Sequence, residues 1–157
     1  MFIGSSFIGD GAGRQLWDNR DGDLRGDRRH LVKLFGVRTL NWHATAGAYF
    51  VAQSGQPWEL WSYEPYVSLT TSTSDVSRYA ERAGTRRSPA HAQLDLKYTQ
   101  SILLGRKYSA QIVGDLFNVT NTQTGYNFQS AAHNSTFGQP RSYFDPRRFQ
   151  MAFQLLY

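Results

Sequence analysis

Aromatic side chains are concentrated in one polar stretch of the chain, and aromatic rings on a protein surface can stack against a sugar, a siderophore or a peptide. The stretch reads QPWELWSYEPY from residue 56 to residue 66, and a second polar stretch later in the chain carries further rings. The candidate ligand-binding residues are Trp58, Trp61, Tyr63, Tyr66, Tyr126 and Phe128. The competing interpretation, to which we give more weight, is that these rings pack their segments together or line a membrane interface.

No pattern in the sequence predicts catalysis, metal binding or a cofactor. The four histidines stand at positions 30, 43, 91 and 133, without the spacing of metal ligands. The acidic cluster between residues 18 and 27 lacks the order and the final glutamate of a calcium loop. The chain has no cysteine and no nucleophile motif such as G-x-S-x-G. We therefore expect no enzyme activity, no metal and no cofactor.

The net charge of the chain is +5, but its basic residues are dispersed. Arginine pairs occur at 28–29, 86–87 and 147–148, and acidic residues lie near the first and last of them. A nucleic-acid interface needs a continuous basic stripe, which this sequence lacks. We therefore expect no nucleic-acid partner.

A further set of candidate residues is polar and alternates with apolar residues along the chain. This alternation is the pattern of strands with one polar and one apolar face. The stretch 92–102 alternates Leu94, Leu96 and Tyr98 with polar side chains, and the stretch 107–119 alternates in the same way. The polar residues of the shared face are Asp95, Lys97, Lys107, Gln111 and Asp115. They would form cross-strand pairs on adjacent strands, or contact a plug or line a substrate path within a barrel. The sequence leaves both roles open.

These residues must be positioned by long strands. The pattern predicts strands near 30–40, 43–53, 92–102, 107–119 and 147–157, and a sixth strand is a further possibility over Met1–Gly9. Each covers about ten residues, which exceeds the usual globular strand of about five or six but suits a tilted crossing of a bilayer. The sequence therefore predicts an all-β, antiparallel, up-and-down meander of five or six long strands.

The connections between these strands alternate between short and long. Two residues, Asn41 and Trp42, join the first pair, and a turn around 104–106 joins the next pair. Two long segments, 54–91 and 120–146, separate the pairs, so both are expected at one end of the sheet as long loops. Outer-membrane barrels show this asymmetry, whereas such long loops are uncommon in compact soluble domains. The prediction is a partial outer-membrane β-barrel.

Aromatic residues near the short connections fit the same interpretation. Trp42, Tyr108 and Tyr157 are expected at one membrane interface as an aromatic girdle, with Arg38 close enough to a turn to snorkel. The alternative is a soluble secreted β-sandwich that binds carbohydrate through its aromatic loops. The two differ in the apolar face of the strands, which a sandwich buries under a second sheet and a barrel leaves facing outward.

Several motifs occur in order along the chain. They read DRRHLVKLFG at 27–36, AQSGQPW at 52–58, QLDLKYTQ at 93–100, DLFNVTN at 115–121, FGQPRSYFDPRR at 137–148 and RRFQMAFQLLY at 147–157. Together they resemble the C-terminal strands of TonB-dependent outer-membrane receptors, in particular the Oar-like branch. The last stretch resembles the assembly signal of outer-membrane proteins at Gln150, Ala152, Leu155 and Tyr157, although that signal usually has glycine where this chain has Ala152.

The resemblance implies a location and a set of partners. The location is the bacterial outer membrane. The partners are outer-membrane lipid, the remainder of the barrel and its plug, the energy-coupling TonB complex and the barrel-assembly machinery. Barrels of this family have about twenty-two strands. Residues 1–157 are therefore expected to be the C-terminal part of such a barrel without its plug, contributing to ligand uptake or surface binding only within the full-length receptor.

Overall fold

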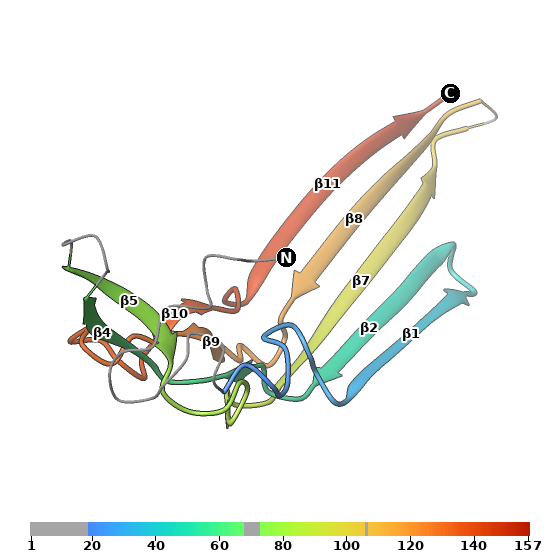
Figure 1. The fold of residues 1–157 in the computed structure, drawn as a ribbon. Coiled ribbons are helices and arrows are strands. Elements are labelled where there is room, and N and C mark those ends of the chain that lie inside the picture. The colour runs from blue at the N-terminus through green and yellow to red at the C-terminus, as the bar shows by residue number, and fades with distance from the viewer. Residues whose placement is uncertain (1–18, 68–72, 106) are drawn as a thin grey trace, which may run out of the picture. The chain divides into compact units, whose positions relative to one another are not determined.

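The computed structural model describes residues 19–67, 73–105 and 107–157, and all regular secondary structure in these residues is β (Figure 1). The strands are β1 (Leu31–Leu40), β2 (Ala44–Gln53), β3 (Pro57–Trp58), β4 (Trp61–Val67), β5 (Thr73–Tyr79), β6 (Arg86–Arg87), β7 (His91–Leu103), β8 (Ser109–Phe117), β9 (Gly125–Phe128), β10 (Pro140–Tyr143) and β11 (Arg148–Leu156). The possible strand over Met1–Gly9 lies outside the described residues.

The part of the chain that the structure describes contains no helix with the length and apolar character needed to span a membrane.

The chain divides into two compact units. The sheet unit consists of Arg29–Ser54, Ala90–Thr124 and Tyr143–Tyr157. The hairpin unit consists of the residues up to Arg28, together with Gly55–Pro89 and Gly125–Ser142. The predicted long strands all belong to the sheet unit, and the predicted aromatic segments belong mainly to the hairpin unit.

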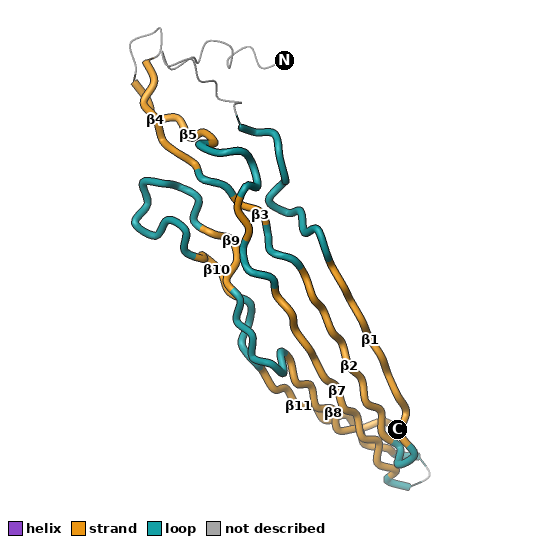
Figure 2. The backbone as a smooth tube through the Cα atoms, turned by 90° about the horizontal axis from the view of Figure 1, so that it is seen from below, coloured by secondary structure: helices purple, strands orange, loops and turns teal. Residues whose placement is uncertain are grey.

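The sheet unit contains one five-strand antiparallel sheet in the order β1-β2-β7-β8-β11 (Figure 2). This confirms the predicted all-β class and the antiparallel pairing of the five long strands. The short connections β1–β2 and β7–β8 lie at one end of the sheet, called here the turn end. The two long connections leave and re-enter at the opposite end, called here the loop end. The described strands form an open sheet with edges at β1 and β11.

The β7–β8 turn is longer than predicted, and this corrects the placement of Lys107. The Leu104 N–H donates to the Tyr108 carbonyl at 2.9 Å, and Gly105 has φ +123°, a conformation that favours glycine. The bond closes the turn at Tyr108, so β8 begins at Ser109. Lys107 is therefore an exposed turn residue and does not belong to the polar strand face.

The two long connections also differ from the prediction, because they contain short strands. β3 pairs with β6, β4 pairs with β5, and β9 pairs with β10. Pro57 lies within β3 and Pro65 within β4, and proline in a strand weakens the sequence signal for it. The two segments predicted as long loops therefore contain small two-stranded sheets.

The register of the sheet separates its residues into two faces. Residues directly opposite each other share a face, and successive residues along a strand alternate between faces. One row of partners reads Val37, Gly47, Lys97, Asp115 and Gln150 across all five strands. It belongs to the polar face, although its β1 member, Val37, is apolar and exposed. The next row reads Arg38, Ala46, Tyr98, Gly114 and Met151 across all five strands, and belongs to the apolar face.

The apolar face is exposed. Phe149 is 61% exposed, and Met151 and Phe153 are each 67% exposed. Leu96, Tyr98, Ile112 and Leu155 are exposed as well. Among the described residues, the buried hydrophobic side chains are only those of Ala44, Trp58 and Ala110. The sheet therefore lacks the hydrophobic core that a folded domain of this size normally builds.

Candidate functional site

Trp58, a predicted ligand-binding ring, is buried in the hairpin unit and only 8% exposed. Its ring stacks on Phe128 with centroids 5.2 Å apart and meets the edge of Phe137 at 6.0 Å. The guanidinium of Arg86 lies 5.2 Å from the centroid of the Trp58 ring, a cation–π distance. Trp58 and Phe128 thus cover each other, which favours the packing interpretation of these two rings over a ligand-stacking role.

Trp61 takes part in a second cluster, around the buried carboxylate of Glu59. The Glu59 side chain accepts hydrogen bonds from Trp61 Nε1 at 2.5 Å, from Arg25 Nε at 3.1 Å and from the Gly84 N–H at 3.2 Å. Glu59 is 1% exposed, and these three donors supply hydrogen bonds to its buried carboxyl group. No local sequence pattern predicts this cluster, because Arg25 and Gly84 are 34 and 25 residues from Glu59.

The other three predicted rings belong to residues on β4 and β9. Tyr126 lies on β9 and is half-buried. Tyr63 and Tyr66 lie on β4, but their side chains are outside the described residues. The six predicted rings therefore do not form one exposed aromatic platform in the part of the hairpin unit that the structure describes.

Four of the five predicted polar residues lie on the polar face of the sheet, and all four make cross-strand or local polar contacts there. Lys97 Nζ lies 3.4 Å from Asp115 Oδ1, and the two residues are direct partners on β7 and β8. Asp95 Oδ1 accepts from Gln93 Nε2 and from the Asn118 N–H, both at 2.8 Å. The structure therefore joins these side chains into a paired surface.

Gln111, the fourth of these residues, donates from Nε2 to Ser101 Oγ at 3.4 Å. Ser101 and Gln111 are direct register partners on β7 and β8, toward the turn end. The polar face thus carries at least two cross-strand polar contacts between the same two strands.

Asn118 closes the loop end of β8 and was not singled out by the sequence. It is buried, has φ +50°, and donates from Nδ2 to the carbonyls of Thr122 and Asp145 at 3.1 and 2.7 Å. Its Oδ1 accepts from the Thr122 N–H at 3.1 Å. Asn118 thereby ties the DLFNVTN stretch to the FGQPRSYFDPRR stretch, which the sequence could show only as separate motifs.

The predicted girdle residues lie at the turn end. Trp42 follows β1, Tyr108 precedes β8, and Tyr157 follows β11, and all three side chains are exposed. Trp42 Nε1 donates to the Tyr98 hydroxyl at 3.1 Å, and that hydroxyl donates to Gln100 Oε1 at 2.7 Å. Gln100 Nε2 returns a hydrogen bond to the Trp42 carbonyl at 2.9 Å. These three residues form a polar trio at the turn end of a surface that is otherwise apolar.

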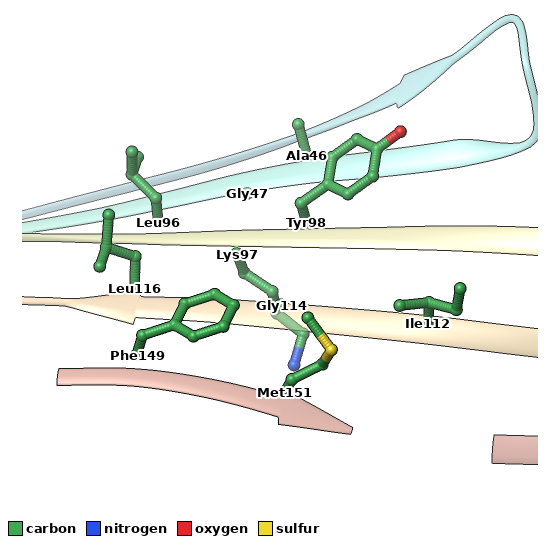
Figure 3. A pocket seen from close by; sticks show the side chains of 10 residues that line it. All are labelled: Ala46, Gly47, Leu96, Lys97, Tyr98, Ile112, Gly114, Leu116, Phe149 and Met151. Atoms are coloured by element: carbon green, nitrogen blue, oxygen red, sulfur yellow. The ribbon is translucent and has the colours of Figure 1, made fainter. Parts of the chain in front are cut away.

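The apolar face also contains a hollow of about 490 Å³ (Figure 3). Large side chains surround it, while Ala46 and Gly114 leave its middle unfilled. The lining residues are Ala46, Gly47, Leu96, Lys97, Tyr98, Ile112, Gly114, Leu116, Phe149 and Met151. Apart from Gly47 and Lys97, all of them lie in rows of the apolar face.

The proposed assembly-signal residues divide between the two faces of β11. Gln150 and Ala152 lie in polar-face rows, opposite Asp115 and Val113. Leu155 lies in an apolar-face row, opposite Ala110. Tyr157 directly follows β11 and is fully exposed.

The described residues contain no group of three or more histidine or acidic side chains placed to hold a metal ion. The chain matches no protein-family model, no curated protein and no solved structure.

Proposed function

We propose that the sheet unit is part of the wall of an outer-membrane β-barrel, in a receptor of the TonB-dependent, Oar-like type. In this proposal it contributes to ligand uptake or surface binding together with the rest of that receptor. The observation that carries the proposal is the exposed apolar face, opposite a face on which Lys97 pairs with Asp115 and Gln111 with Ser101. In a barrel wall the apolar face contacts lipid, and the polar face turns toward the lumen and the plug.

The energetics favour a hydrocarbon environment for the apolar face. A large aliphatic or aromatic side chain gains about 1.5–3 kcal/mol when it is moved completely from water into an apolar environment. Phe149, Met151, Phe153 and Leu155 present four such side chains on one strand. Leaving all of them in water forfeits several kcal/mol, whereas contact with acyl chains recovers that free energy.

The dimensions of the apolar face also suit a membrane. From Phe149 to Tyr157 the apolar residues span eight steps along the chain, which at roughly 3.3 Å per step is about 27 Å. A tilt of about 40° reduces this to roughly 20 Å along the membrane normal, close to the apolar band of about 25 Å in outer-membrane barrels. The exposed rings of Trp42, Tyr108 and Tyr157 would lie at the interface bounding this band.

The open edges of the sheet support the remainder of a barrel as a partner. An unpaired backbone group in hydrocarbon costs several kcal/mol, so both β1 and β11 need neighbouring strands in a membrane. Five strands are also fewer than the roughly eight that fill the smallest barrels. Because β1 and β11 run in the same direction, closing the barrel with antiparallel pairs takes an odd number of further strands.

A second copy of the chain is a poor substitute for those strands. Two copies placed edge to edge in the same orientation would pair β11 of one with β1 of the other in parallel. Turning one copy over restores antiparallel pairing but moves its loop end to the opposite side of the membrane. The geometry therefore favours strands of different sequence as the neighbours.

The soluble sandwich fits the sheet less well. It would bury Leu96, Tyr98 and Ile112 under a second layer, yet each of them is at least 38% exposed. It would also offer aromatic rings to a carbohydrate, yet Trp58 and Phe128 cover each other.

Fluorescence quenching tests the proposal directly, because the chain has no cysteine to remove. Phe153→Cys and Gln154→Cys place single thiols on opposite faces of β11, one residue apart. Each is labelled with an environment-sensitive fluorophore, and the full chain is placed in mixed micelles of phospholipid and mild detergent, which tolerate open sheet edges. We expect lipids with nitroxide-labelled acyl chains to quench position 153 strongly and position 154 weakly, and aqueous iodide to show the reverse. Equal quenching at both positions, or no quenching by the labelled lipid at 153, would contradict the barrel-wall proposal.

A further inference from the structure

We propose that the apolar face carries a binding site for one glycerophospholipid, with an acyl chain in the hollow and the phosphate at Arg38. This proposal rests on the barrel-wall function, because only a lipid-facing surface meets such a ligand. Three observations carry it: the shape of the hollow, the position of a single cation in the same row, and the polar trio beside both.

The hollow is formed by a contrast in side-chain size on adjacent strands. Gly114 on β8 and Ala46 on β2 leave space, and Leu116, Phe149 and Met151 rise around it (Figure 3). The volume of about 490 Å³ falls within the range of roughly 300–1,000 Å³ that is typical of small-molecule sites. Its lining is almost entirely apolar, so an acyl chain matches it chemically.

Arg38 lies in the same cross-strand row as the middle of the hollow. It is the partner of Ala46, which pairs with Tyr98, which in turn pairs with Gly114. Neighbouring strands are about 4.8 Å apart, so the backbone of Arg38 is roughly 10 Å from that of Tyr98. An extended arginine side chain covers much of that distance.

Arg38 is also the one charged residue in the apolar-face rows of the five strands, all of which lie within the described residues. Its side chain is exposed, and no carboxylate shares this face to neutralise it. A guanidinium at the edge of a hydrocarbon layer is stabilised by an anion, and its planar fork suits a phosphate. The headgroup of a phospholipid supplies such an anion.

The polar trio of Trp42, Tyr98 and Gln100 marks the expected depth of this headgroup. The Tyr98 ring lines the hollow, while its hydroxyl joins Trp42 and Gln100 at the turn end. A ring with one apolar and one polar side is typical of the membrane–water interface. A lipid whose headgroup lies at this level sends its acyl chains away from the turn end, past Tyr98 and into the hollow.

Binding of a fluorescent phosphatidylglycerol to the full chain in neutral detergent micelles tests the site. The test variants are Arg38→Gln, which removes the cation, and Gly114→Leu, which fills the hollow. A Cβ atom at Gly114 would meet only Phe149 Cε2, at 3.7 Å, and Phe149 Cζ, at 4.0 Å, so the sheet tolerates a side chain there. The matched controls are Lys33→Gln, which removes a cation from the other face of β1, and Val113→Leu, which enlarges a side chain on the other face of β8.

We expect each test variant to weaken phosphatidylglycerol binding about tenfold and each control to leave it within about twofold, the scale of one charge-assisted contact. Unlabelled phosphatidylglycerol should compete, whereas diacylglycerol without phosphate and inorganic phosphate without acyl chains should compete poorly. Equal affinity in all variants, an equal loss in Lys33→Gln, or equal competition by diacylglycerol would overturn the lipid site.

The two proposals fail in different ways. Quenching of a fluorophore at position 153 by labelled lipid should persist in Arg38→Gln and Gly114→Leu, because the rest of the apolar face is unchanged. Normal quenching with unaltered phosphatidylglycerol binding would reject the lipid site alone. Loss of quenching in the unmodified background would reject the barrel-wall function itself.

Discussion

Lys97 and Asp115 face each other across β7 and β8 with Nζ and Oδ1 3.4 Å apart, on the polar side of a sheet whose other side is apolar. The pair shows how the sheet divides its polar and apolar residues. The charged residues of these two strands meet on one face, and the opposite face of β7 and β8 carries no charged side chain.

The Lys97–Asp115 pair is expected to add modestly to stability, because the lysine side chain is 59% exposed. A double-mutant cycle with Lys97→Met and Asp115→Asn should give a coupling free energy of about 0.2–1 kcal/mol, as for exposed ion pairs and cross-strand pairs. Denaturant unfolding of the four proteins in micelles measures it. A coupling of several kcal/mol would instead indicate a desolvated pair.

Glu59→Gln is expected to destabilise the hairpin unit by about 1.5–3 kcal/mol, because it removes the charge that three donors share. Unfolding followed by tryptophan fluorescence reports the loss, because Trp58 and Trp61 both lie in the hairpin unit. Asp21→Asn is the matched control, since Asp21 and its partner Arg82 are both largely exposed. The control should change stability by less than about 0.5 kcal/mol. Equal effects of the two substitutions would show that burial of Glu59 has no energetic consequence.

Trp58→Ala is expected to lower the stability of the hairpin unit by about 3–5 kcal/mol, because the ring is buried between Phe128, Phe137 and Arg86. Near-ultraviolet circular dichroism and thermal unfolding measure the effect. Trp61→Phe should be milder, since it keeps a ring against Tyr79 and loses only the hydrogen bond to Glu59. A Trp58→Ala protein of normal stability would return Trp58 to the list of candidate ligand contacts.

Asn118→Ala is expected to loosen the loop end of the sheet while leaving the turn end intact. The substitution removes the side chain that holds Thr122 and Asp145, at a cost of about 1–3 kcal/mol for the polar groups left unpaired. Hydrogen exchange should accelerate at Thr122 and near Asp145 but not at Leu104, whose N–H is held within the β7–β8 turn. Uniform acceleration across the sheet would mean that Asn118 acts on global stability instead.

The long strands could be predicted because their signal is local. Phe149, Met151, Phe153 and Leu155 alternate with polar or small residues, and this period of two identifies a strand with two different faces. The alternating short and long connections then placed both long segments at one end. The observed strand ends lie within two residues of the predicted ones. The difference matters most for Lys107, which was predicted in the fourth long strand but lies in the turn before β8.

The remaining features depend on contacts between residues far apart in the chain. Arg25 reaches Glu59, and Asn118 reaches Asp145, 27 residues later; neither pairing leaves a periodic trace in the sequence. Trp58 reads as an exposed loop aromatic until its partners Phe128 and Arg86 are known. The hollow likewise could not be predicted without the strand register. Ala46 and Gly114 share a row only through Tyr98, their common partner on β7.

The central claim is that the apolar face of the sheet contacts lipid, and a spin-label scan of β11 tests it most directly. Single cysteines from Arg148 to Leu156 in the full chain, labelled with a nitroxide in phospholipid–detergent micelles, report collisions with oxygen in hydrocarbon and with a nickel complex in water. We expect oxygen accessibility to peak at positions 149, 151, 153 and 155, and nickel accessibility to peak at the positions between them. Low accessibility to both reagents at the odd positions would mean that a second protein layer covers this face, and that result would contradict the barrel wall.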